Sequence, residues 1–132
     1  MSNEFYKTNN IELLKGDCIK ILDNIEKDSV DMIFADPPYF LSSGGITCKS
    51  GKIAKVDKGD WDKTVDFKEK YEFNKSWISK CKEVLTDNGT IWISGTVHNI
   101  YVIGFVLEEL GFKIINNITW QKTNPPPNMS CR

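Results

Sequence analysis

The apolar segment Val30–Ala35 runs directly into Asp36 and two consecutive prolines, and this feature constrains the fold more than any other. The segment (Val-Asp-Met-Ile-Phe-Ala) is short and mostly apolar, which is typical of a strand in a protein core. Pro37 and Pro38 have fixed φ angles and no N–H donor, so we expect the strand to leave its sheet there. Each proline also holds the residue before it in an extended conformation. The sequence therefore predicts a core strand with a stiff, extended exit.

Strand-like and helix-like segments alternate along the rest of the chain. Apolar runs predict further strands at residues 11–15, 90–94 and 112–122. Helical spacing of apolar residues predicts helices at about 18–25, 66–85 and 99–110. Asp17 is the expected N-cap of the first helix, and we expect residues 87–89 and Gly111 to end the other two. This alternation predicts an α/β fold, a mainly parallel sheet flanked by helices, with ligands beyond the carboxyl ends of its strands.

Residues 40–64 are rich in Gly, Ser, Lys and Asp and show no helical or strand periodicity. A loop of this length is uncommon inside a compact domain and is usually functional or mobile, so we expect a mobile loop here. Within it, residues 49–58 hold four lysines and one aspartate. A solvated loop is the simpler interpretation for any single lysine of this segment. The family resemblance described below implies the other interpretation, which is contact with phosphates at the border of a DNA cleft.

The composition narrows the class of protein. The 132 residues fit one domain or part of one. The sequence has 17 Lys and Arg against 18 Asp and Glu, and this net charge of -1 excludes a protein that is strongly basic overall. The sequence has neither an apolar run of about 20 residues nor a signal-peptide core, which predicts a cytoplasmic protein without a membrane partner. Four cysteines without a Cys-x-x-Cys pair, and a single histidine, predict free thiols and no metal site.

The tetrapeptide Asp36-Pro37-Pro38-Tyr39 offers hydrogen-bond acceptors and an aromatic ring together at the predicted strand end. The Asp36 carboxylate and a main-chain carbonyl, most simply that of Pro37, are suited to accept the two hydrogens of an exocyclic NH₂ group. Stacking on Tyr39 would stabilise a planar nucleobase by ~1–3 kcal/mol. Held this way, the nitrogen lone pair leaves conjugation and points at an electrophile, in a geometry that the prolines pre-organise. The simpler alternative is a surface turn, where Asp and Pro are common.

In this setting the tetrapeptide resembles the catalytic motif of the DNA amino-methyltransferases. These enzymes transfer a methyl group from S-adenosylmethionine to N6 of adenine or N4 of cytosine, in a base flipped out of the stack. Three further segments are similar to parts of the same family: Lys15-Gly16-Asp17, residues 89–95 and residues 117–128. The last of these resembles the target-side strand and loop of the permuted (beta-class) branch.

The resemblance implies a Rossmann-like methyltransferase fold and S-adenosylmethionine as the cofactor. It assigns catalysis to Asp36, Pro37, Pro38 and Tyr39, and contact with the cofactor to Asp17 and Asp36. Residues 57–63 and 98–101 resemble the adenine methyltransferases that accompany GATC-specific restriction systems. We therefore expect a site-specific DNA adenine-N6 methyltransferase of a restriction-modification system, acting on double- or single-stranded DNA.

Three residues are expected on the DNA side of the site. Phe40, directly after Tyr39, would close the base pocket; covering the sheet is its alternative role. Lys122 and Asn124 lie at or beyond the end of the 112–122 run, where Lys is suited to phosphates and Asn to adenine edges. Turn formation is the alternative role of Asn124.

The family holds the methionine end of its cofactor on a glycine-rich Phe-x-Gly-x-Gly loop, which this sequence lacks. The nearest glycine runs are Gly44-Gly45 and Gly51, inside the expected 40–64 loop. In the permuted branch the glycine-rich loop follows the target-recognition region. We therefore expect residues 1–132 to be the N-terminal catalytic half of a methyltransferase domain, with the missing C-terminal half or a second copy as partner. A split or decayed gene is the alternative.

Two other functions stay open. A truncated, non-catalytic homologue would bind DNA or a partner subunit without a cofactor. A related enzyme with the same chemistry would methylate N4 of cytosine, an RNA base or a protein glutamine. Asp36 and residues 117–128 favour a DNA base.

Overall fold

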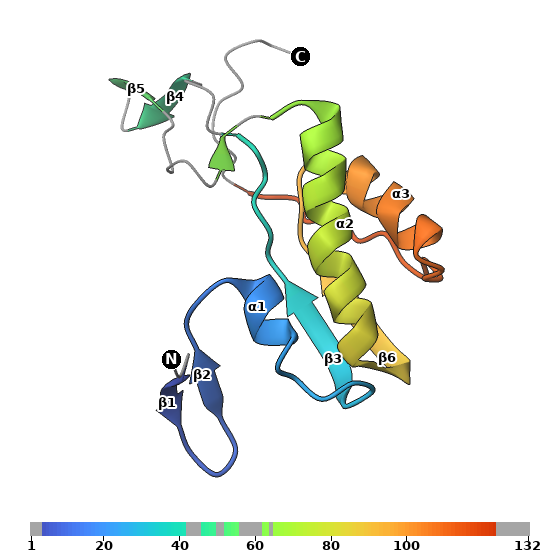
Figure 1. The fold of residues 1–132 in the computed structure, drawn as a ribbon. Helices are drawn as coiled ribbons and strands as arrows, with labels where there is room; N and C mark the ends of the chain where they lie inside the picture. Colours follow the sequence, from blue (N-terminus) through green and yellow to red (C-terminus); the bar gives the residue numbers. More distant parts are fainter. Residues whose placement is uncertain (1–3, 42–45, 50–51, 56–61, 64, 124–132) are drawn as a thin grey trace.

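The computed structural model describes residues 4–41, 46–49, 52–55, 62–63 and 65–123 (Figure 1). Its helices are α1 (Cys18–Leu22), α2 (Phe67–Val84) and α3 (Ile100–Glu109). Its strands are β1 (Glu4–Lys7), β2 (Glu12–Leu14), β3 (Val30–Ala35), β4 (Ile46–Lys49), β5 (Lys52–Lys55) and β6 (Leu85–Ile93). The strand at 30–35 and the helices that follow Asp17, Asp66 and Asn99 confirm the corresponding sequence predictions.

The hydrophobic core lies between the helices and one face of a parallel strand pair, β3 and β6. Ile33 pairs in register with Ile91, and Ala35 with Ile93, so these side chains share one face of the pair. The buried members of the core come from α2 and α3: Trp77, Ile78, Cys81, Ile103 and Val106. In Figure 1, α2 runs along the two strands with α3 at its side. Two parallel strands connected through a helix confirm that the fold belongs to the α/β class.

The long helix α2 forms because its start is capped and one of its sides is apolar. Oδ1 of Asp66 accepts a hydrogen bond from the Glu69 N–H at 2.8 Å, which satisfies a donor in the first turn. At the surface, Glu109 of α3 accepts hydrogen bonds from Lys75 at 2.8 Å and from the Tyr71 hydroxyl at 2.8 Å. Such exposed contacts contribute about 0–1 kcal/mol each, so apolar burial is the main term that joins α2 to α3.

The opposite face of the β3–β6 pair carries apolar side chains that stay exposed in the described part of the chain. Met32, Phe34 and Trp92 are 61%, 69% and 43% exposed, and Phe34 is the register partner of Trp92. Parallel sheets in α/β proteins are normally covered on both faces. The described residues are therefore compatible with part of an α/β fold.

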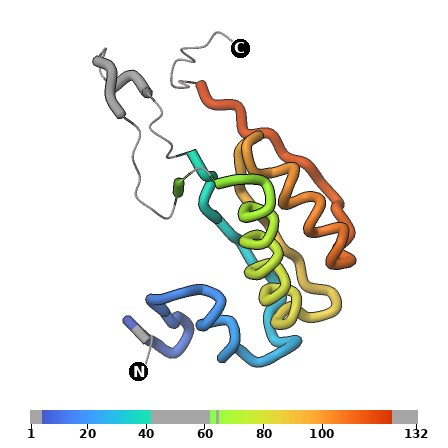
Figure 2. Tube along the Cα trace, turned by 45° about the horizontal axis from the view of Figure 1, so that its top comes forward, coloured from blue at the N-terminus to red at the C-terminus, as the bar shows by residue number. Residues whose placement is uncertain are grey.

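The prediction of a strand at residues 112–122 is wrong. The structure assigns neither helix nor strand to residues 112–123, which lie wholly within its described part. Ile115, Ile118 and Trp120 are 73%, 71% and 87% exposed. An apolar run becomes a strand only where a neighbouring strand takes its hydrogen bonds, and no described strand pairs with this segment. In Figure 2 it is the extended trace, orange to red, that follows α3.

The expectation that residues 87–89 end the second helix by a turn is also wrong. Helix α2 changes directly into β6 at Leu85, so the turn-forming residues lie inside the strand. There the register shifts: Val30 pairs with Leu85 but Met32 with Thr90, so β6 carries extra residues opposite β3. A Cβ on Gly89 would lie 3.0 Å from the Val30 carbonyl oxygen, a tight contact that favours glycine at this irregularity.

Two antiparallel hairpins stand apart from the parallel pair. Strand β2 covers part of the predicted run at 11–15, but it pairs with β1 and does not join β3 and β6. Strands β4 and β5 pair within the segment expected to be a loop, so that expectation missed a hairpin. The dipeptide Ser50-Gly51, which is typical of turns, is the signal that could have indicated it. The described helices include none that is long and apolar enough to cross a membrane.

Candidate active site

The candidate site begins where the two parallel strands end side by side. The Ser94 N–H donates to the Ala35 carbonyl at 2.9 Å, which is the last rung between β3 and β6. The next residue of each chain segment therefore projects from the same edge: Asp36 after β3 and Ser94 after β6. The Ser94 hydroxyl donates a hydrogen bond to Oδ1 of Asp36. This is the edge at which α/β sheets place their ligands.

Tyr39 folds back onto the same carboxylate. Its hydroxyl donates to Oδ1 of Asp36 at 2.6 Å and lies 3.1 Å from Oγ of Ser94. The bond to Asp36 raises the pKa of Tyr39 above its ordinary value, because ionisation of the phenol would lose that bond and place two negative charges together. Burial adds to this rise, while the contact with Ser94 partly offsets it. Tyr39 therefore remains a neutral donor near neutral pH.

A buried chain of side-chain amides holds the main chain of the tetrapeptide from the α3 side. Asn99 lies just before α3 and is fully buried; its Nδ2 donates to the Pro38 carbonyl at 3.2 Å. Its Oδ1 accepts a 2.9 Å hydrogen bond from Asn74, which is also fully buried in α2. Oδ1 of Asn74 in turn accepts from Nε1 of Trp77 at 3.1 Å. The polar groups of this chain satisfy one another inside the core, as buried polar groups must.

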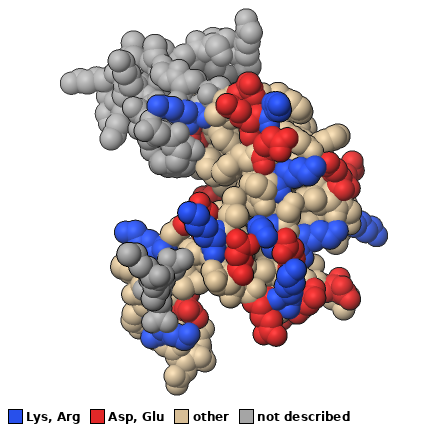
Figure 3. Space-filling view, viewed as in Figure 1, with Lys and Arg blue, Asp and Glu red and all other residues tan. Residues whose placement is uncertain are grey.

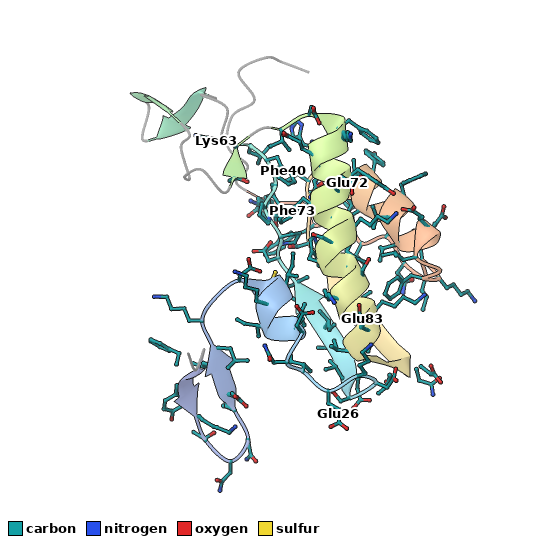
Figure 4. The ribbon with its side chains drawn as sticks, viewed as in Figure 1. Glu26, Phe40, Lys63, Glu72, Phe73 and Glu83 are labelled. Atoms are coloured by element: carbon teal, nitrogen blue, oxygen red, sulfur yellow. The ribbon has the colours of Figure 1, made fainter. Side chains whose placement is uncertain are left out.

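Asp62 holds the same tetrapeptide from the other side. Its side chain is 1% exposed, and its Oδ1 accepts the N–H of Tyr39 at 2.9 Å and the N–H of Phe40 at 2.8 Å. Phe40 has a φ of 57°, in the left-handed region that residues with a side chain rarely adopt. Its buried ring packs edge-on against Phe73 with centroids 5.6 Å apart. Figure 4 labels both side chains beside α2. Nζ of Lys70 lies 5.5 Å from the Phe40 ring centroid.

The remaining predicted site residues lie in different environments. Asp17 caps α1, accepting the N–H of Ile19 at 2.9 Å, and this confirms its N-cap role. Lys122 is exposed, and Asn124 lies outside the described residues. Cofactor contact by Asp17 and DNA contact by Phe40, Lys122 and Asn124 stay predictions. Among the described residues, no group of three His, Cys, Asp or Glu is placed to hold a metal ion.

Charges on the described surface are mixed in sign. On the face shown in Figure 3, Lys and Arg side chains alternate with those of Asp and Glu along α2 and its surroundings. Lys80, for example, lies 2.8 Å from Asp23 and 3.2 Å from Glu83. The described residues of this face therefore form no broad patch of one charge sign.

Comparison with known proteins identifies the family of the chain. Residues 30–132 match the protein family N6_N4_Mtase, described as DNA methylase. The chain belongs to this family. The resemblance to the DNA amino-methyltransferases is therefore confirmed, over a range that includes the tetrapeptide and all the side chains that hold it.

Relatives within the family are named Type II methyltransferases. The chain is 58% identical to M2.DpnII of Streptococcus pneumoniae and 57% identical to M2.LlaDCHI of Lactococcus lactis subsp. cremoris. Each match covers 100% of this chain and 49% of the relative. M2.MboI of Moraxella bovis is 54% identical over 123 residues. The chain thus spans about half the length of these relatives.

Four of the residues around the tetrapeptide 36–39 make contacts that the sequence did not reveal. They are Asp62, Asn74, Ser94 and Asn99. Ser94 lies at the end of the predicted strand 90–94 and in the segment 89–95 that resembles the family, but neither feature predicted its bond to Asp36. Asp62 lies in the segment 57–63 that resembles GATC-system enzymes. Asn74 gives no signal beyond a polar residue on the apolar side of a predicted helix.

Proposed function

We propose that the protein is an S-adenosylmethionine-dependent DNA methyltransferase specific for N6 of adenine, and that residues 1–132 supply its catalytic half. One observation carries the proposal: in a DNA methylase family member, Asp36-Pro37-Pro38-Tyr39 follows β3 at the edge where α/β folds bind ligands. Relatives named Type II methyltransferases support it. The proposal includes a restriction-modification system with GATC as the target, following residues 57–63 and 98–101, and a cytoplasmic location.

The chain's own groups bind and orient the target amine. The Asp36 carboxylate and the Pro37 carbonyl accept its two hydrogens, which turns the nitrogen lone pair out of the base plane. Asp36 is exposed, and the Tyr39 ring is tethered beside it, so an acceptor and a stacking surface occur together. The nitrogen would attack the methyl carbon as its bond to sulfur breaks, with S-adenosylhomocysteine as the leaving group, and the methylated, cationic nitrogen would then release its proton to solvent. The reaction therefore needs no covalent intermediate with the enzyme and no early catalytic base.

The cofactor supplies an electrophilic methyl group on its sulfonium sulfur when it is bound. We assign contact with its adenosine part to Asp17 and Asp36, because both carboxylates are exposed in the structure. Oδ1 of Asp17 already accepts two main-chain N–H groups, but a carboxylate has about four acceptor positions and retains capacity for a ligand. We assign the methionine end to a glycine-rich loop outside residues 1–132, which would also complete the Rossmann-like fold.

DNA approaches the site from the side of Phe40, Lys122 and Asn124 in this proposal. Phe40 supports the wall of the base pocket through its packing on Phe73. Lys122 meets a phosphate and Asn124 meets the target strand or base edges. The C-terminal half, or a second copy of the chain, supplies the remaining DNA contacts.

The experiment is a methyl-transfer assay on the full-length gene product. Labelled S-adenosylmethionine is offered with GATC and scrambled oligonucleotides, both single- and double-stranded, and the labelled nucleoside is identified by mass spectrometry. We expect label in N6-methyladenine within GATC. Label in N4-methylcytosine, in RNA or in protein would contradict the substrate assignment. Absence of label from every DNA would overturn the proposed activity.

Asp36 provides the mutational arm of this experiment. We expect Asp36→Ala to lower the single-turnover rate by about 100-fold or more, since it removes the acceptor that orients the amine. Asp31→Ala is the matched control, because Asp31 is an exposed aspartate of β3, the strand that Asp36 follows, and its carboxylate lies 3.3 Å from the Thr86 hydroxyl, away from the tetrapeptide. Equal rates in the two variants would favour the surface-turn interpretation of residues 36–39.

A further inference from the structure

The peptide group that joins Pro38 to Tyr39 is held at both of its polar ends. Its carbonyl oxygen accepts from Nδ2 of Asn99 at 3.2 Å, and its N–H donates to Oδ1 of Asp62 at 2.9 Å. The C=O and the N–H of a trans peptide point in opposite directions, so the two partners reach it from opposite sides. A peptide group bound at both ends has little freedom to rotate about its long axis.

Both partners come from far along the chain and are buried. Asp62 is 1% exposed and Asn99 is fully buried. A buried carboxylate is costly unless hydrogen bonds satisfy it, and the N–H groups of Tyr39 and Phe40 supply two such bonds to Asp62. Tyr39 carries the first N–H after the two prolines, so Asp62 takes the first main-chain donor beyond the strand exit. Asn99 is fixed in turn by Asn74 at 2.9 Å.

Backbone strain at Phe40 indicates that this arrangement is enforced. A left-handed conformation such as the φ of 57° at Phe40 costs ~1–2 kcal/mol for a residue with a side chain. Such strain persists only where the surroundings over-determine it, and it is concentrated at functional sites. Here the Asp62 carboxylate holds the Phe40 N–H at 2.8 Å, and Phe73 packs against the ring.

We propose that Asp62 and Asn99 form a peptide clamp and act as positioning residues for methyl transfer. The clamp fixes the plane of the Pro38–Tyr39 peptide, and through the rigid prolines it sets the direction of the Pro37 carbonyl and the placement of the Tyr39 ring. The inference rests on the proposed function, because it assigns the clamp to the same tetrapeptide. A misplacement of about 1 Å at a reacting centre lowers rates by about 100-fold, so a clamp outside the chemistry has a measurable effect.

The first test is the amide hydrogen exchange of Tyr39 and Phe40, which needs neither cofactor nor activity. In the full-length gene product we expect both amides to be protected, although they belong to no helix or strand. In Asp62→Ala both should exchange at least about tenfold faster. Fast exchange of these amides in the wild-type protein would overturn the proposal, even if Asp62→Ala fails to fold.

The second test separates positioning from stability by single-turnover methylation at saturating DNA and cofactor. We expect Asp62→Ala to lower the rate by about 10- to 100-fold while the KM values for DNA and cofactor change less than about threefold. Asp62→Asn keeps an acceptor oxygen at the same place, so it should stay within about threefold of wild type.

Asp66→Ala is the matched control for Asp62→Ala. Asp66 also accepts a main-chain N–H through Oδ1, from Glu69 at 2.8 Å, but it does not touch the tetrapeptide. The Asp66→Ala variant should be less stable than wild type but should keep the wild-type single-turnover rate. An equal rate for Asp62→Ala and Asp66→Ala in an active protein would overturn the clamp alone. Failure of the wild-type protein to methylate any DNA would instead overturn the proposed function.

Discussion

The hydroxyl of Tyr39 donates a 2.6 Å hydrogen bond to Oδ1 of Asp36, so the aromatic ring of the candidate site is tethered to its carboxylate. Ser94 donates to the same oxygen. Two hydroxyl donors therefore occupy one side of the group that we expect to accept the target amine. When the amine binds, it meets a carboxylate whose orientation is already set, and the tether to Tyr39 competes with it. The hydroxyl and the ring of Tyr39 thus have separable effects.

Substitution of Tyr39 separates these effects. We expect Tyr39→Phe to keep the single-turnover rate within about threefold of wild type, because the ring remains and only the competing donor is lost. Tyr39→Ala should lower the rate by about 5- to 150-fold, which corresponds to the ~1–3 kcal/mol of base stacking. Rapid-quench methylation measures both variants. A phenylalanine variant as slow as the alanine variant would show that the hydroxyl, and not the ring, is required.

Removal of the Ser94 hydroxyl tests how the carboxylate is oriented. Hydrogen bonds to charged groups contribute ~1.5–3 kcal/mol, so we expect Ser94→Ala to lower the single-turnover rate by about 10- to 150-fold. Ser94→Thr retains a hydroxyl and should preserve most of the activity, because the side chain is only partly buried. Thermal unfolding provides the stability control. A rate unchanged in Ser94→Ala would mean that Tyr39 and the prolines orient Asp36 without help.

The sequence predicted those parts of the fold that depend on residues close together along the chain. The strand at 30–35 and the Asp17 cap were recognisable because apolar spacing and capping chemistry act over a few residues. The run at 112–122 failed because a strand needs a neighbour, and pairing is a property of the fold and not of the segment. The turn-forming residues 87–89 were misassigned because a strand irregularity uses the same residue types as a helix end.

The candidate site likewise has one part that the sequence predicted and another that it did not. The tetrapeptide was predictable because its chemistry is contiguous along the chain. Its supports were not, because Asp62, Ser94 and Asn99 meet it across 23, 58 and 61 residues of sequence. Long-range polar contacts of this kind leave no periodic signal. Only the fold shows that an aspartate in a charged, glycine-containing segment is buried against a strand exit.

The buried amide chain predicts a large difference between two asparagines with the same local contact. Asn74 and Asn24 each donate from Nδ2 to the carbonyl four residues earlier, at 2.8 Å and 2.7 Å. Only Asn74 is buried, where it also binds Asn99 and Trp77. We expect Asn74→Ala to lower the free energy of unfolding by about 2 kcal/mol or more, because it leaves Asn99 and Trp77 each without a hydrogen-bond partner. Asn24→Ala should lower it by about 0.5 kcal/mol or less. Urea denaturation measures both; equal losses would contradict the buried chain.

The two cysteines of the described helices should differ sharply in reactivity. Burial, together with the charge of Cys18, raises the pKa of the Cys81 thiol from 9.0 to about 11, while Cys18 is exposed. At about pH 8 we therefore expect iodoacetamide to modify Cys18 readily and Cys81 only after unfolding, as peptide mapping would show.

The raised pKa of Cys81 also makes stability depend on pH, because the unfolded chain releases the Cys81 proton at a lower pH than the folded chain does. Stability should therefore fall as the pH rises from 9.0 to about 11, by up to about 2–3 kcal/mol. In Cys81→Ala this fall should be absent, and its persistence would mean that another group causes it.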